Sequence, residues 1–180
     1  IYDINNTSLK DAIVQFGGGC TGEIISPEGL LLTNHHCGLS FVQKLSSIEH
    51  DYLTDGFWAK SKGEELPNQG LSVLFLNKVE DVTEAVLKGV TAQTTEAERD
   101  ELVAKNSRAL AKERKGDRNV RVEVVPFYSG NQYILFEYDE YKDVRLVCCP
   151  PWGIGKYGAD TDNWTWPRHK GDFNIFRVYT

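Results

Sequence analysis

The sequence predicts a mainly β protein, in which antiparallel strands are interrupted by one inserted surface helix. Short segments rich in β-branched and aromatic residues occur on both sides of a single long polar segment, residues 94–115. That polar segment is rich in Glu, Ala, Lys, Arg and Leu, which favour a helix. Strands grouped around one helix, rather than alternating with helices, favour an antiparallel barrel over a parallel βαβ sheet.

The first predicted hairpin turns at residues 26–29. Apolar residues lie on both sides, and Pro27 with Gly29 occupy the second and fourth positions, which is typical of a type I turn. Pairing Ser26 with Gly29 sets a register that places Cys20 opposite His35 and diagonal to Cys37. We therefore expect a disulfide between Cys20 and Cys37.

The remaining elements follow in order along the chain. Residues 41–52 carry mixed helical and loop signals, and residues 56–59 form an aromatic patch in a connecting segment. The helix begins where Thr94 and Thr95 precede glutamates, and it ends before Gly116. Further strands are predicted at residues 71–76, 120–127, 132–138, 143–147 and 173–179, with residues 139–140 separating the third from the fourth.

Composition excludes several classes of function. The 180 residues carry 20 Lys and Arg against 26 Asp and Glu, a net charge of -6, so we do not expect a nucleic-acid partner. No apolar stretch approaches the roughly 20 residues that span a membrane. The chain lacks Met and starts at Ile1, which suggests a processed or excised piece of a longer polypeptide.

The candidate chemistry starts at His35, His36 and Cys37, directly after a predicted strand. One interpretation is structural, with one imidazole capping a loop and the other solvated. A second is a metal site, but adjacent side chains of an extended segment point to opposite faces, and no HExxH or paired CxxC accompanies them. We therefore expect no metal and no cofactor. We assign no role to the adjacent pair Cys148 and Cys149.

The third interpretation is a catalytic base held by a buried carboxylate. Asp172 is the best candidate, because it lies at the head of an alternating strand where it can reach the rim of a barrel. An aspartate there is also a common turn cap. The residues alone leave open which histidine would be the base.

The sequence resembles a known family. Cys20, residues 26–30 and residues 33–37 (Thr-Asn-His-His-Cys) resemble the first-barrel half of a chymotrypsin-type serine peptidase. More specifically, the sequence resembles the bacterial dipeptidyl-peptidase 7 and 11 group, which are exopeptidases that remove N-terminal dipeptides. The blocks that carry this resemblance are residues 36–38, 43–47, 50–53, 55–59, 160–164 and 166–173, including Asn-Trp-Thr-Trp-Pro-Arg-His at 163–169. It extends from about Phe16 to the last residue.

The resemblance implies a fold and site residues. Residues 1–180 would form the N-terminal barrel portion of a catalytic domain, the first part of a chymotrypsin-like double β-barrel. His36 would be the general base and Asp172 its orienting acid. Asn163 and Trp164 would hold the α-amine of the substrate, since an amide oxygen accepts from an ammonium and an indole attracts a cation.

The resemblance also implies partners and a compartment. Substrates would be oligopeptides with a free N-terminus, and the full-length enzyme would be a homodimer. Family and disulfide together imply the periplasm or the cell surface of a bacterium. The preference for an acidic or a hydrophobic residue beside the scissile bond cannot be read, because that pocket belongs to the second barrel.

No nucleophile is predicted within the chain. The sequence contains neither Gly-Asp-Ser-Gly nor Gly-x-Ser-x-Gly, so we expect the serine elsewhere and the isolated chain to be inactive. Two alternatives to the peptidase remain: an inactive peptide-binding relative that lacks the serine, and a zinc-binding structural module.

Overall fold

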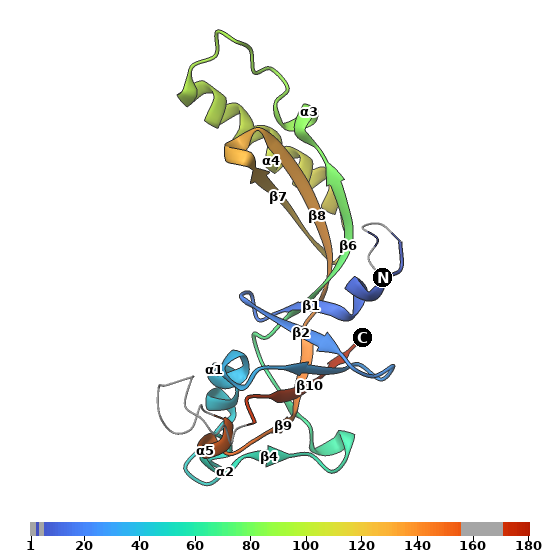
Figure 1. Cartoon of the computed structure of the whole chain (residues 1–180), viewed down its shortest axis with the longest axis vertical. Helices are drawn as coiled ribbons and strands as arrows, with labels where there is room; N and C mark the ends of the chain where they lie inside the picture. The colour runs from blue at the N-terminus through green and yellow to red at the C-terminus, as the bar shows by residue number, and fades with distance from the viewer. Residues whose placement is uncertain (1–2, 4–5, 156–170) are drawn as a thin grey trace. The chain divides into compact units, whose positions relative to one another are not determined.

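The computed structural model describes residue 3, residues 6–155 and residues 171–180 (Figure 1). The strands are β1 (Ile13–Phe16), β2 (Cys20–Ile24), β3 (Leu30–Thr33), β4 (Phe57–Trp58), β5 (Leu66–Pro67), β6 (Val73–Asp81), β7 (Val120–Phe127), β8 (Gln132–Tyr141), β9 (Asp143–Cys149) and β10 (Asn174–Tyr179). The α-helices are α1 (His35–Leu45), α2 (Tyr52–Asp55), α3 (Thr83–Val86), α4 (Glu96–Lys115) and α5 (Trp152–Gly155). Short 3-10 helices are η1 (Leu9–Ala12), η2 (Lys62–Glu64) and η3 (Tyr128–Gly130).

The chain divides into two compact units. Unit 1 consists of Ile1–Lys10 and Phe75–Glu140, and unit 2 consists of Asp11–Leu74 and Tyr141–Thr180. The chain passes from one unit to the other inside η1, inside β6 and inside β8.

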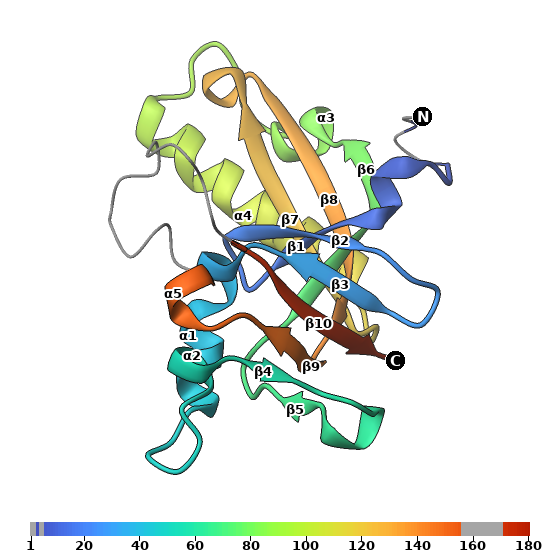
Figure 2. The ribbon, with the colours of Figure 1, turned by 60° about the horizontal axis from the view of Figure 1, so that its bottom comes forward.

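Unit 2 is an open antiparallel sheet, as expected for part of a β-barrel. Its strands lie in the order β4-β9-β10-β3-β2-β1, and β5 also pairs with β9. Strand β10 therefore lies between β3 and β9, which Figure 2 shows clearly. Phe16, Leu31, Leu146 and Phe176 are fully buried, and the rings of Phe16 and Phe176 are 4.9 Å apart. Apolar burial of this kind is the main stabilising contribution to the unit.

The β2–β3 hairpin has the predicted turn and register. The Gly29 amide donates to the Ser26 carbonyl at 3.2 Å, and Glu23 pairs with Leu32. Gly29 has φ +77°, and a Cβ there would lie 2.5 Å from the Val178 carbonyl oxygen. Glycine is thus required both by the backbone conformation and by the close approach of β10.

Unit 1 contains the predicted surface helix. Strands β6, β8 and β7 are neighbours in that order, and α4 packs along β7 (Figure 1). Thr95 and Glu98 form a reciprocal capping box at the start of α4, and Gly116 is its C-cap. No residue of α4 is fully buried. A narrow seam containing Val103 and Leu110 packs on the unit's core, which consists of Val82, Val86, Tyr133 and Leu135.

One expectation about the strands was wrong. Residues 139–140 do not separate two strands: β8 continues to Tyr141, because Asp139 still pairs with Val120 of β7 through the backbone. The mixed signals of residues 41–52 are confirmed, since α1 runs to Leu45, a loop follows, and α2 begins at Tyr52. The two-residue strands β4 and β5, and the four-residue β1, are too short for alternation to reveal them.

Across the described ranges 6–155 and 171–180, none of the helices combines the length and the apolar character needed to span a membrane.

Candidate active site

Helix α1 begins where the sequence was expected to stay extended. Asn34, a favoured N-cap residue, has extended φ and ψ of -69° and 150°, and its carbonyl accepts from the amides of Cys37 and Gly38. His35 and His36 are therefore the first two residues of a helix that is separated from β3 by Asn34 alone. Their side chains leave the helix about 100° apart rather than on opposite faces of a strand.

His36 and Asp172 lie together, as predicted. The Nδ1 atom of His36 is 3.1 Å from Oδ2 of Asp172, and the His36 backbone amide donates to Oδ1 at 3.2 Å. Because a carboxylate only accepts, Nδ1 carries the proton and Nε2 is the basic nitrogen. The His36 side chain is 70% exposed and that of Asp172 is 18% exposed, so the base faces solvent and its partner is largely shielded.

The position of Asp172 has a local electrostatic cause. Amides in the first turn of a helix have no acceptor within the helix, and this end carries partial positive charge. The Asp172 carboxylate supplies an acceptor to one of them, and the Asn34 side chain adds a donor at 3.3 Å. The start of α1 thus holds the Asp172 side chain, which orients His36, through two hydrogen-bond donors.

His35 has a different environment from its neighbour. It is 2% exposed, and its Nδ1 lies 3.1 Å from Oδ1 of Asn174, while Nδ2 of Asn174 donates to the His35 carbonyl at 3.1 Å. Burial lowers the pKa of His35 below its ordinary value, although the Asn174 hydrogen bond and the charge of Asp172 oppose this. His35 is therefore a buried neutral side chain, and only His36 is accessible to a substrate.

The predicted disulfide is present. Cys20 on β2 and Cys37 in the first turn of α1 are bonded, with their Cα atoms 6.0 Å apart. The expected route was wrong in one respect: Cys20 does not lie opposite His35 in a strand pair, because β3 ends at Thr33 and Cys20 pairs with Phe16 of β1. The bridge ties the start of α1 to the sheet of unit 2.

The zinc interpretation of residues 35–37 does not fit this geometry. The Cys37 sulfur is bonded to Cys20, and the His35 ring contacts Asn174. In the part of the chain that the structure describes, no group of three or more His, Cys, Asp or Glu side chains could hold a metal ion.

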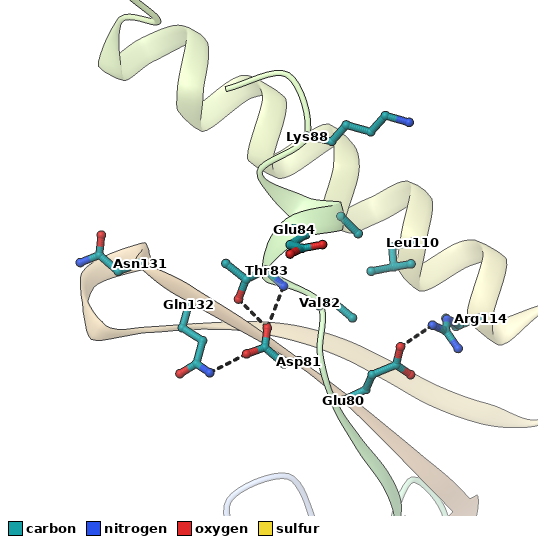
Figure 3. A pocket seen from close by; sticks show the side chains of 11 residues that line it. Glu80, Asp81, Val82, Thr83, Glu84, Lys88, Leu110, Arg114, Asn131 and Gln132 are labelled. Carbon is teal, nitrogen blue, oxygen red and sulfur yellow. Dashed lines mark hydrogen bonds and ion pairs between the residues drawn. The ribbon is translucent and has the colours of Figure 1, made fainter. Parts of the chain in front are cut away.

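A cavity of about 970 Å³ lies in unit 1, and none of the predicted site residues lines it. Asp81 accepts hydrogen bonds from Thr83 and Gln132 at 2.6 and 2.7 Å, and Arg114 donates to Glu80 at 2.7 Å (Figure 3). Both carboxylates thus have neighbouring donors, as on an ordinary solvated surface.

Comparison with known proteins identifies the family. The model of the family described as Peptidase S46 matches residues 1–180.

The chain belongs to the peptidase S46 family.

Curated dipeptidyl-peptidases are similar to this S46 chain. An Asp/Glu-specific dipeptidyl-peptidase of Capnocytophaga gingivalis is 53% identical over 179 residues, which is 99% of this chain and 25% of the relative. Dipeptidyl-peptidase 7 of the same organism is 51% identical over 180 residues, which is 100% of this chain and 25% of the relative. The chain thus spans about a quarter of the length of the curated relatives it matches.

Solved structures of this family share the fold. The crystal structure of Porphyromonas endodontalis DPP11 in complex with substrate is 47% identical, with a TM-score of 0.83 over 100% of this chain and 27% of that one. The same protein in an alternate conformation gives a TM-score of 0.86 at 50% identity.

Two residues of this S46 chain that the sequence did not predict belong to the site, and two predicted ones fall in a part of the chain that the structure does not describe. Asn163 and Trp164 lie outside the described residues. Asn174 was missed, although it carries a signal: it lies two residues before Phe176, at an inward strand position where a polar side chain needs a partner. Asn34 was also missed; asparagine is common at the N-cap, but here its side chain makes no capping hydrogen bond and donates to Asp172 instead.

Proposed function

We propose that this chain supplies the histidine and the aspartate of a serine-type dipeptidyl-peptidase, which removes dipeptides from the N-termini of oligopeptides. The observation that carries the proposal is the pair formed by solvent-exposed His36 and shielded Asp172, joined at 3.1 Å. The names of the S46 relatives support the dipeptidyl-peptidase class.

In the proposed mechanism, His36 transfers protons and Asp172 orients it. A serine in another part of the full-length protein attacks the scissile carbonyl while Nε2 of His36 takes its hydroxyl proton. The imidazolium then gives this proton to the departing amine, and water hydrolyses the acyl-enzyme with the same base. Asp172 holds the proton on Nδ1 and stabilises the imidazolium that forms.

The exopeptidase character would come from a pocket for the substrate's α-amine. The family resemblance assigns this pocket to Asn163 and Trp164. An ammonium anchored there lies two residues from the reacting carbonyl, so that binding at one end sets the position of the cut at the other.

Residue preference beside the scissile bond does not follow from this chain. Identity is 53% to an Asp/Glu-specific relative and 51% to a dipeptidyl-peptidase 7, so the chain is almost equally similar to both. Assaying the full-length protein on oligopeptides whose second residue is acidic or hydrophobic would decide between the two preferences.

The test of the proposed function compares two variants of the full-length protein. His36→Ala should lower kcat on the order of 10⁴-fold or more while dipeptide affinity stays nearly unchanged, because the base acts in proton transfer. Asn163→Ala should lower kcat/KM about ten- to hundredfold. Capping the substrate amine should lower kcat/KM of the wild type by at least the same factor.

The matched control is His50→Ala, which removes an exposed histidine of the same unit and should leave turnover unchanged. Wild-type turnover by His36→Ala would reject the assigned base. If a full-length protein with an intact pair neither cleaved peptides nor reacted with a serine-directed fluorophosphonate, it would be the inactive peptide-binding alternative.

We further propose that the full-length enzyme is a homodimer in the periplasm or at the cell surface of a bacterium. The Cys20–Cys37 disulfide supports an oxidising compartment, and the family resemblance supports the dimer. Cell fractionation and light scattering on the purified protein test the two statements separately.

A further inference from the structure

We infer that Asn174 is a positioning residue that sets the geometry of the His36–Asp172 pair by locking the first turn of α1 to β10. The inference rests on the proposed function, since it names what holds the catalytic pair in place. It comes from side chains that lie behind the pair, away from solvent.

Both ends of the Asn174 amide are used on one residue. Its Nδ2 donates to the His35 carbonyl at 3.1 Å, and its Oδ1 lies 3.1 Å from Nδ1 of the His35 ring. Asn174 is fully buried and His35 is 2% exposed, so water does not compete for these bonds. A buried amide that binds both the backbone and the ring of one residue fixes that residue's position and orientation.

Gly38 makes this close approach possible. A Cβ at position 38 would lie 2.1 Å from Nδ2 of Asn174 and 3.2 Å from Cε2 of Phe176. Any side chain there would displace the Asn174 amide from the His35 carbonyl. Glycine at position 38 therefore leaves the space that the buried amide occupies.

The same two segments carry the catalytic pair. His35 and His36 are consecutive, and Asp172 and Asn174 are two residues apart, so the chain segment entering β10 contacts the start of α1 at two points. The contact on the solvent side, between His36 and Asp172, is the one that would take part in catalysis. The buried point, His35 with Asn174, makes no contact with solvent and determines how the two segments align.

The test is Asn174→Ala in the full-length peptidase. Loss of the lock lets α1 shift relative to Asp172, and a displacement on the order of 1 Å at a catalytic group can cost about 100-fold in rate. We expect kcat to fall about 10- to 100-fold while KM stays within about twofold, because substrate contacts are unchanged. Asn68→Ala is the control, since Asn68 is a buried asparagine of the same unit and should keep kcat within about twofold.

The outcomes are separable. A folded Asn174→Ala enzyme with near-wild-type kcat overturns the inference, and so does a loss of activity that only follows the folded fraction measured by circular dichroism. If this variant does not fold, Asn174→Leu decides by the same criteria, because leucine has a similar volume but can neither donate to the His35 carbonyl nor accept from the His35 ring. Failure of both to fold would show a purely structural role and also overturn the inference.

The His36→Ala enzyme, measured alongside, separates this inference from the proposed function. If His36→Ala is inactive while Asn174→Ala is not impaired, only the positioning role fails. If His36→Ala is active, the proposed function itself fails.

Discussion

Two adjacent histidines differ in burial because a helix begins at the first of them. His35 points into unit 2 and contacts Asn174, whereas His36 is 70% exposed and contacts Asp172. The residue types are identical, so environment alone separates a buried polar anchor from a candidate base.

The buried histidine makes stability depend on pH. Because the pKa of His35 is lowered in the folded state from its ordinary 6.5, the unfolded chain binds a proton more readily than the folded one at mildly acidic pH. Stability should therefore fall as pH decreases through 6.5. Urea unfolding of the wild type and of His35→Gln at several pH values between about 7.5 and 5.5 gives the free energy of unfolding as a function of pH. This free energy should fall less steeply with decreasing pH in the variant. Parallel slopes would contradict this explanation.

The cysteines should divide into one bonded pair and two unreactive thiols. Burial raises the pKa of Cys148 to about 11 and that of Cys149 to about 12, which leaves almost no thiolate at neutral pH. A thiol reagent should label neither in the native protein, and it should label two of the four cysteines in denaturant without reductant. Labelling of all four under those denaturing conditions would disprove the disulfide and remove the support for an oxidising compartment.

At the scale of elements, β10 is held by a buried ion pair as well as by its two neighbouring strands. Nε of Arg177 donates to Oε1 of Glu65 at 2.8 Å, and the Tyr179 hydroxyl donates to Oε2 at 2.8 Å. Arg177 also donates to the Glu28 carbonyl at 2.9 Å, in the β2–β3 turn. The network joins β10, the turn and the segment between η2 and β5.

Removing one partner of this pair should be costly. Arg177→Ala would leave the Glu65 carboxylate, whose side chain is 2% exposed, without its counter-ion, and we expect a loss of about 3–5 kcal/mol in the free energy of unfolding. The control is Lys62→Ala, which removes an exposed ion pair to Glu28 and should cost less than about 1 kcal/mol. Chemical denaturation of both variants provides the comparison, and similar losses would show that the Arg177 pair contributes no more than a surface pair.

At the scale of the whole molecule, the predicted pair and the predicted helix lie in different units. His36 and Asp172 are 136 positions apart, yet both belong to unit 2, while residues 75–140 in between belong to unit 1. The long separation in sequence is thus compatible with a short distance in space.

The 180-residue chain alone should hydrolyse no peptides. It has a base and an acid but none of the serine motifs named above, and members of a catalytic triad act as a unit. Dipeptide release should be measured on the isolated chain, shown by circular dichroism to be folded, beside the full-length protein. Turnover by the isolated chain, with contaminating protease excluded, would require a nucleophile within these residues and would reject the assigned roles.

Features that depend on neighbours along the chain could be predicted from the sequence. Alternation located β7, β9 and β10, the Thr95–Glu98 pattern located the start of α4, and turn chemistry located the β2–β3 hairpin. The disulfide partners were also predicted correctly, although Cys20 does not lie opposite His35 as the register argument required. Asp172 was selected by its place at the head of a strand. Local propensity and side-chain period determine such features, and both can be read over a few residues.

Only the tertiary structure decided how the start of α1 meets β10. The residues alone did not distinguish His35 from His36, and they gave no role to Asn174 or Gly38. These roles depend on contacts across more than 130 positions, such as the 3.1 Å bonds from Asn174 to His35 and from His36 to Asp172. No local pattern encodes such a contact, because it exists only when the sheet of unit 2 brings β10 beside β3 and so places Asn174 against the first turn of the helix.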